Sequence, residues 1–230
     1  MGKINVVMNN AETQQEIESG CLIAPREYQT ECVSTIRQKW NDGVTSQLVI
    51  LPTGTGKTIV LAQLVKELGR RTLILAHRDE LLTQAAEKIL RINPDADIGI
   101  FKGKERGGLE REICIASVQT ATRHTDKLKT RNFILCICDE AHHATAKSYR
   151  RIFDDLGFLG GDPSKLLLGV TATPFRADDQ SLKGVFEEIV FERFIQQMII
   201  DGFLVAVRGI RVGTNTKVLL NNKCINICHR

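Results

Sequence analysis

The chain has 230 residues, enough for one large domain or for one domain with an appendage. Its net charge of +4 arises near the C-terminus, because residues 202–230 contain five basic and no acidic side chains, which leaves 26 basic against 27 acidic residues before them. A uniformly basic nucleic-acid coat is therefore excluded, and any nucleic-acid site must be a local patch.

Two further features bound the class of protein. No apolar run reaches the roughly 18 residues that a membrane span needs, so we expect no membrane partner. The seven cysteines are an odd number, and no secretory apolar run opens the chain. Both observations favour a reducing, intracellular compartment.

The elements are predicted from apolar periodicity in chain order. Residues 1–24 are polar and form only a lead-in segment, whereas residues 25–40 have helical spacing and stop at Asn41-Asp42-Gly43. Strands are then expected at 47–51, 72–76, 98–101, 113–116, 133–138 and 166–170, and helices at 59–68, 79–90 and 194–202. Continuous apolar strands separated by helices predict an α/β fold, a mainly parallel sheet with helices on both faces. Residues 203–212 are expected to form a last strand, and residues 213–230 a linker remnant or disordered tail.

The stretch LPTGTGKT joins the first expected strand to the next helix. Glycine-rich backbone lets successive N–H groups surround a phosphate, and the helix N-terminus adds positive potential. The predicted nucleotide-binding residues of this loop are Thr53, Gly54, Thr55, Gly56, Lys57 and Thr58. Lys57 supplies a fixed charge and Thr58 a hydroxyl for Mg²⁺. The strict phosphate-loop pattern has a glycine where this chain has Leu51.

A pair of carboxylates follows the strand at 133–138, in the sequence CICDEAHH. Ligands of open α/β sheets collect at such strand ends. We expect Asp139 to hold Mg²⁺ and Glu140 to orient or deprotonate the attacking water, which makes Lys57, Asp139 and Glu140 the predicted catalytic residues. An alternative is that the acids merely cap the next helix. His142 is expected to link the acid pair to another segment.

Three motifs in this order, PTGTGKT, DEAH and TATP at 171–174, resemble motifs I, II and III of the superfamily 2 helicases. REYQ at 26–29 resembles the segment that reads adenine in several groups, which implies Gln29 as base reader and Arg26 as its support. AHRDELLTQ at 76–84 and ASVQT at 116–120 are similar to motifs Ia and Ib. The resemblance covers residues 25–212 and is nearest to the restriction-enzyme translocating subunits and other double-strand-dependent ATPases.

The resemblance implies a RecA-like P-loop NTPase domain at residues 25–212 that uses ATP and Mg²⁺. The resemblance implies a nucleic-acid backbone, that of double-stranded DNA, as the partner of Arg78, Gln119 and Thr120. Coupling of nucleotide state to that partner is implied for His142, Thr171 and Thr173. The chain would be the first motor lobe of a DEAH-type helicase or translocase.

Helicases of this superfamily have a second RecA-like lobe that brings an arginine finger, and no second strand–helix series is predicted after residue 212. We therefore expect that lobe to come from a longer form or another chain. Since arginine fingers are worth roughly 10³ to 10⁵ in rate, the chain alone should hydrolyse ATP weakly.

Other interpretations stay open at this point. The chain could be a non-hydrolysing nucleotide or nucleic-acid binding module that regulates a longer enzyme, or another P-loop NTPase, although no N-K-x-D guanine reader occurs. Structural explanations also exist for single residues. Arg78 could be a solvated charge, Gln119 and Thr120 could cap a helix, Thr171 and Thr173 could satisfy a turn, and Tyr28 and Trp40 could belong to the core.

Overall fold

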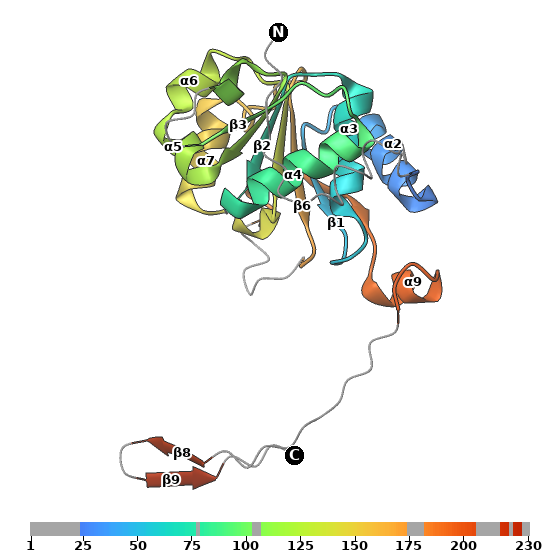
Figure 1. The fold of residues 1–230 in the computed structure, drawn as a ribbon, viewed down its shortest axis with the longest axis vertical. Helices are drawn as coiled ribbons and strands as arrows, with labels where there is room; N and C mark the ends of the chain where they lie inside the picture. The colour runs from blue at the N-terminus through green and yellow to red at the C-terminus, as the bar shows by residue number, and fades with distance from the viewer. Residues whose placement is uncertain are drawn as a thin grey trace.

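The computed structural model describes residues 24–76, 79–102, 107–173, 182–205, 217–220 and 223–226. Within these residues, seven strands pair in parallel to form one sheet in the order β3-β4-β2-β5-β6-β1-β7 (Figure 1). The strands are β1 (Ser46–Ile50), β2 (Thr72–Ala76), β3 (Ile98–Phe101), β4 (Ile113–Ser117), β5 (Leu135–Asp139), β6 (Leu166–Thr171) and β7 (Glu188–Glu192).

Helices cover both faces of this sheet (Figure 1). The α-helices are α2 (Glu27–Asn41), α3 (Lys57–Leu68), α4 (Asp79–Ile92), α5 (Val118–Arg123), α6 (Thr125–Lys129), α7 (Lys147–Asp155) and α9 (Ile195–Ile200), and the 3-10 helices are η1 (Gly107–Glu110) and η2 (Ala141–His143). One buried cluster joins the sheet to α2, α3 and α4, and the other joins it to α5 and α7. The predicted α/β class with a parallel sheet is confirmed.

Successive side chains of strand β5 point to opposite faces of the sheet and belong alternately to the two clusters. Leu135 and Ile137 belong to the cluster under α3, whereas Cys136 and Cys138 belong to the cluster under α7. All four are fully buried, so the two cysteines fill the core as small apolar residues.

The strand order brings three loops together at the carboxyl edge of the sheet. Strand β6 lies between β5 and β1, with Thr171 paired to Ile50 on one side and Val170 paired to Asp139 on the other. The segments that follow β1, β5 and β6 therefore leave the sheet side by side.

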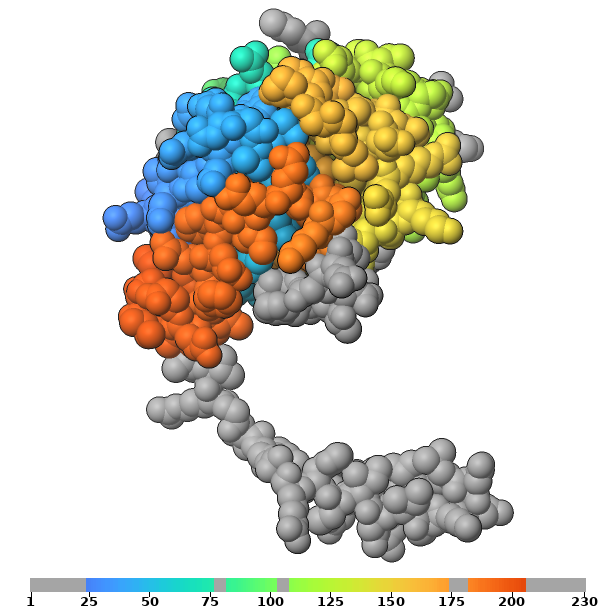
Figure 2. Space-filling model, turned by 180° about the vertical axis from the view of Figure 1, so that it is seen from behind, coloured from blue at the N-terminus to red at the C-terminus, as the bar shows by residue number. Residues whose placement is uncertain are grey.

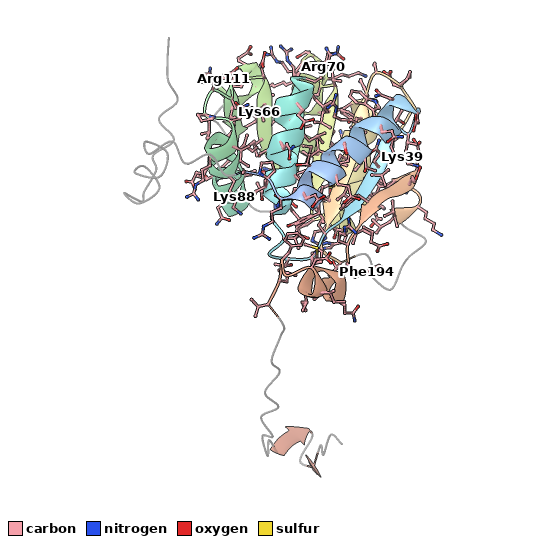
Figure 3. The ribbon with its side chains drawn as sticks, turned by 90° about the vertical axis from the view of Figure 1, so that its right-hand side faces the viewer. Lys39, Lys66, Arg70, Lys88, Arg111 and Phe194 are labelled. Atoms are coloured by element: carbon pink, nitrogen blue, oxygen red, sulfur yellow. The ribbon has the colours of Figure 1, made fainter. Side chains whose placement is uncertain are left out.

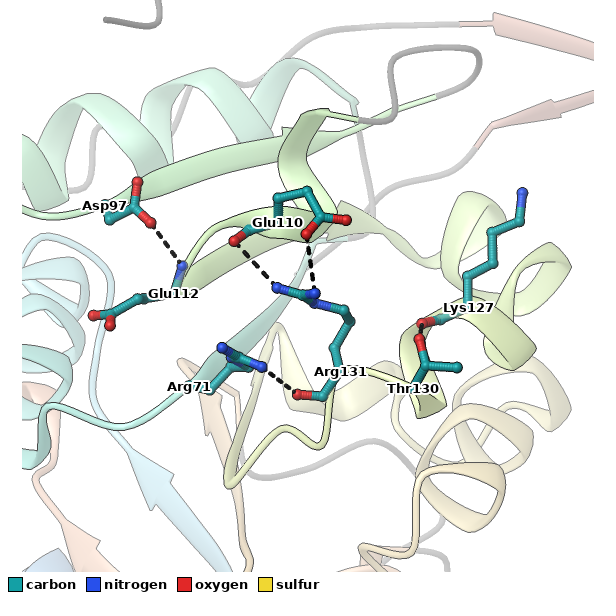
Figure 4. A network of polar contacts seen from close by, with 7 residues as sticks. All are labelled: Arg71, Asp97, Glu110, Glu112, Lys127, Thr130 and Arg131. Carbon is teal, nitrogen blue, oxygen red and sulfur yellow. Dashed lines mark hydrogen bonds and ion pairs between the residues drawn. The ribbon is translucent and has the colours of Figure 1, made fainter. Parts of the chain in front are cut away.

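The amino edge of the sheet carries polar contacts that fasten the connections (Figure 4). Arg131 donates from Nη1 to Glu110 Oε2 at 3.0 Å and from Nη2 to the Glu110 carbonyl at 3.1 Å, and its own carbonyl accepts from Arg71 Nη1 at 3.0 Å. Asp97 accepts from the Glu112 amide at 3.2 Å. These contacts hold the chain ahead of β2, β4 and β5, at the end of the sheet opposite the three loops.

Most predicted strands agree with the structure within two residues at each end, but β7 and the helices α5 to α7 were not predicted. The strand expected over 203–212 is wrong at its start, because Phe203 and Leu204 turn back toward α9, and both of their amides donate to Met198 O at 2.9 Å. The remainder of that prediction lies outside the described residues.

The C-terminal part contains an element that the sequence analysis did not anticipate. Strands β8 (Lys217–Leu220) and β9 (Lys223–Asn226) pair antiparallel. The boundaries expected at residues 24 and 212 stay predictions. In the described part of the chain, no helix combines the length and the apolar character needed to cross a membrane.

Candidate nucleotide-binding site

The loop between β1 and α3 has the backbone shape expected of a phosphate cradle. Gly54 and Gly56 have φ angles of 85° and 76°, in the left-handed region that favours glycine. Between them, the buried Thr55 folds back, and its Oγ1 donates to the Pro52 carbonyl at 2.7 Å. Lys57 is the first residue of α3, so its charge stands at the helix N-terminus.

Leu51 explains why the strict phosphate-loop pattern fails at its first glycine. Its side chain is fully buried in the cluster under α3, and its amide donates to the Thr171 carbonyl at 2.9 Å. The chain therefore stays in the sheet ladder for one residue beyond β1, and the loop begins to turn only after it. Leu51 fills core at that position, and the left-handed turns fall at Gly54 and Gly56.

The acid pair leaves β5 through a strained residue. Asp139 is the last residue of the strand, and Glu140 has φ 52° and ψ 52°, a left-handed conformation that costs a non-glycine residue about 1–2 kcal/mol. The Glu140 amide donates to Asp139 Oδ1 at 3.0 Å. Glu140 precedes η2 but makes no side-chain capping bond to it, so its carboxylate does not act as the helix cap that the alternative required.

Burial raises the pKa of Asp139, and the negative charge of Glu140 raises it further, whereas the Glu140 amide and the positive charges of Lys57 and Lys88 lower it. The balance leaves this carboxylate short of positive charge. A divalent cation would supply that charge. The oxygen donors available, the Asp139 carboxylate and the Thr58 hydroxyl, are of the type that Mg²⁺ prefers.

A chain of side chains joins the acid pair to the segment after β6. His142 Nδ1 lies 3.2 Å from Glu140 Oε2 and 3.4 Å from Thr171 Oγ1. The fully buried Thr171 hydroxyl accepts from the Thr173 amide and donates to the Thr173 carbonyl, both at 3.2 Å. The same hydroxyl thus closes a turn and touches the histidine, as both interpretations of these threonines required.

The start of α2 is tied to the phosphate loop. Gln29 is 1% exposed; its Nε2 donates to the Thr55 carbonyl at 3.0 Å and to Tyr28 Oη at 3.4 Å, and its Oε1 accepts from the Arg26 amide at 2.8 Å. Tyr28 Oη donates to the same Thr55 carbonyl. Tyr28 is buried in the core, as predicted. Both amide hydrogens of Gln29 are therefore engaged within the chain, whereas Arg26 and Glu27 are the exposed residues of the segment.

The residues expected to contact nucleic acid differ in their exposure. Ser117, which the sequence analysis did not single out, caps α5: its Oγ accepts from the Thr120 amide at 3.3 Å and donates to Thr120 Oγ1 at 3.0 Å. Thr120 is buried in this cap and Gln119 is exposed. The S-x-x-T spacing at a strand end is a capping signal that could have been read. Arg78 lies outside the described residues.

Comparison with known proteins places the chain in a family. The family model with the description "Type III restriction enzyme, res subunit" matches residues 22–176. The chain belongs to this family. With it the resemblance to superfamily 2 helicases is confirmed, and the chain is an N-terminal RecA-like lobe of that superfamily.

Curated relatives of this helicase lobe are longer proteins. The putative ATP-dependent helicase IRC3 of Saccharomyces cerevisiae is 37% identical over 201 residues, which cover 80% of this chain and 29% of IRC3. The putative DNA 3'-5' helicase Rad25 of Haloarcula marismortui is 33% identical over 175 residues, which cover 73% of this chain and 25% of that protein. The chain thus spans less than a third of the length of either relative.

A solved structure agrees with the fold. The crystal structure of the Hef helicase domain of Pyrococcus furiosus superposes with a TM-score of 0.58 at 23% identity, covering 73% of this chain and 38% of that one. At this identity the agreement concerns the RecA-like fold alone.

Proposed function

We propose that the chain binds Mg-ATP and forms the first motor lobe of an ATP-dependent DNA helicase or translocase of DEAH type. One observation carries the proposal. The strand order β5-β6-β1 sets the phosphate loop, the acid pair and the Thr171–Thr173 turn next to one another at the carboxyl edge of the sheet. ATP use follows the family, whose relatives are named as ATP-dependent helicases.

The loop residues have complementary roles in this proposal. The backbone amides of residues 53–56 and the Lys57 ammonium bind the β- and γ-phosphates at the N-terminus of α3. Thr58 and Asp139 would hold Mg²⁺, which when bound neutralises charge on the phosphate oxygens. Glu140 orients the attacking water and accepts its proton.

The proposal also names the residues that couple ATP hydrolysis to the nucleic-acid partner. Because His142 contacts both Glu140 and Thr171, a change at the carboxylate when the γ-phosphate leaves reaches the segment after β6. Gln119, exposed at the start of α5, and Arg78 would contact the backbone of a nucleic acid, in our proposal double-stranded DNA. The relative that is named as a DNA helicase supports DNA as the partner.

The chain alone should turn over ATP slowly. The resemblance assigns the arginine finger to a second RecA-like lobe, which a longer form or another chain would supply, and such a finger is worth roughly 10³ to 10⁵ in rate. The much greater length of both relatives supports this part of the proposal.

The test is steady-state ATP turnover with and without double-stranded DNA, for the wild type, Glu140→Gln and the control Glu110→Gln, whose carboxylate pairs with Arg131 at the opposite edge of the sheet. The proposal expects DNA-stimulated turnover in the wild type and the control, and its loss in Glu140→Gln with retained ATP binding. Equal, near-zero turnover in all three with retained binding would favour the non-hydrolysing module.

A further inference from the structure

The turn that follows α9 rests against the nucleotide site, although the sequence analysis placed a strand there. Gly202, with φ 75°, ends the helix, and its amide donates to Ile199 O at 3.1 Å while the Phe203 amide donates to Met198 O at 2.9 Å. This pair of bonds is a Schellman motif, which requires the left-handed residue that glycine provides. Met198 is fully buried, so the turn has a fixed anchor.

The turn touches both parts of the site. A Cβ added at Gly54 in the phosphate loop would lie 3.5 Å from Leu204 Cδ2. The Phe203 ring packs edge-on against Tyr28 with centroids 4.7 Å apart, and Tyr28 itself contacts the Thr55 carbonyl. Residues from opposite ends of the described lobe therefore converge on one loop, and Figure 2 shows β7 and α9, in orange, packed beside α2, in blue.

Phe203 presents a ring that a cation already covers. The Arg26 guanidinium lies 5.5 Å from the ring centroid, and Arg26 Nη1 donates to the Phe203 carbonyl at 3.5 Å. Phe203 is only partly buried and Arg26 is exposed. An aromatic face and a planar guanidinium are the two groups on which nucleobases stack.

The neighbouring polar group is already engaged. Gln29 is buried and both hydrogens of its amide are donated within the chain, so neither hydrogen is free for the edge of a base, and we look to other side chains for contact with the base. We propose that Phe203 is a specificity-determining residue, whose ring stacks on the base of the nucleotide held by the phosphate loop, with Arg26 moving to the outer face of that base. This inference rests on the proposed function and extends it to the base.

The test compares two ligands by calorimetry at saturating Mg²⁺: ATP, and inorganic tripolyphosphate, which has no base. Phe203→Ala should weaken ATP binding about 5- to 150-fold, the worth of stacking one base on an aromatic side chain, and should leave tripolyphosphate binding unchanged. The control is Phe194→Ala, which removes a ring that is 54% exposed on the approach to α9 (Figure 3). It should bind both ligands like the wild type.

A second variant keeps an aromatic ring at position 203 and makes its stacking on the base visible by fluorescence. Phe203→Trp should retain ATP affinity, and ATP should quench the introduced indole whereas tripolyphosphate should not, relative to the wild type with its one tryptophan, Trp40.

The outcomes separate the two proposals. Unchanged ATP affinity in Phe203→Ala, or an equal loss for both ligands, overturns the stacking role while leaving the phosphate site intact. A wild type that binds neither ligand overturns the proposed function and the stacking role together.

Discussion

Gly56→Ala tests whether the Gln29 amide is held against the phosphate loop by its hydrogen bond to the Thr55 carbonyl, a contact that we call the Gln29 clamp. Gly56 has φ 76° and ψ 41°, and an added Cβ would lie 2.7 Å from Gln29 Nε2, closer than a real Cβ can approach. The alanine must therefore displace a buried amide that donates to the Thr55 carbonyl.

The expected cost has two parts. A left-handed alanine costs about 1–2 kcal/mol, and a buried donor left without its acceptor costs about 1–3 kcal/mol. Gly56→Ala should thus lower the free energy of unfolding by about 2–5 kcal/mol. Gly69→Ala, at the end of α3, is the matched control: its φ is 54° and an added Cβ meets nothing within 4 Å, so only the backbone part applies.

Urea denaturation of the two variants measures both costs. In a Gln29→Ala background, where the amide is already gone, the cost of Gly56→Ala should fall to that of Gly69→Ala. Equal losses for Gly56→Ala and Gly69→Ala in the wild-type background would refute the clamp, as would an undiminished cost when Gln29 is absent.

Three further predictions concern the acid pair and strand β6 beside it. Burial raises the pKa of Asp139 above its ordinary 3.8. Between the ordinary and the raised pKa the folded chain holds a proton that the unfolded chain has lost, so the stability of the fold falls as pH rises through this range. Asp139→Asn should therefore unfold at higher urea near neutral pH and show no gain near pH 3; a loss at neutral pH would contradict this. Gly169→Ala places a Cβ 2.3 Å from a Phe186 ring atom, so it should cost about 1–3 kcal/mol in the same assay, and Phe186→Leu should recover part of it. Thr171→Val removes the hydroxyl that faces His142 and should lower DNA-stimulated ATP turnover while calorimetry shows unchanged ATP affinity; full turnover would sink the coupling role.

The sequence predicted the central strands well because they are buried on both faces. Residues 72–76 were placed to the residue, and the glycine loop and acid pair were placed at strand ends. The partly exposed edge strand at 98–101 was also placed to the residue. Strand β7 was missed because it reads EIVFE, with charged ends and the exposed Ile189 in place of a continuous apolar run.

The local sequence pattern could not predict the contacts between residues of the site that are far apart in the chain. Apolar residues after Asp201-Gly202 read equally as a strand, and only the bonds to Met198 make them a turn. The burial of Gln29 depends on Thr55, which is 26 residues away in the chain. Spacing placed the glycine loop and the acid pair at strand ends, whereas the hydrogen-bond partners of these residues depend on the assembled sheet.

The most direct test of the account is calorimetric titration of Mg-ATP into the wild type and Lys57→Ala. The account predicts saturable binding at one site in the wild type and its loss in the variant, with the control Lys66→Ala, at an exposed position in the last turn of α3, binding like the wild type. Equal affinity in the wild type and Lys57→Ala would contradict the phosphate-binding role of the loop, and with it the assignment of this lobe as a nucleotide-driven motor.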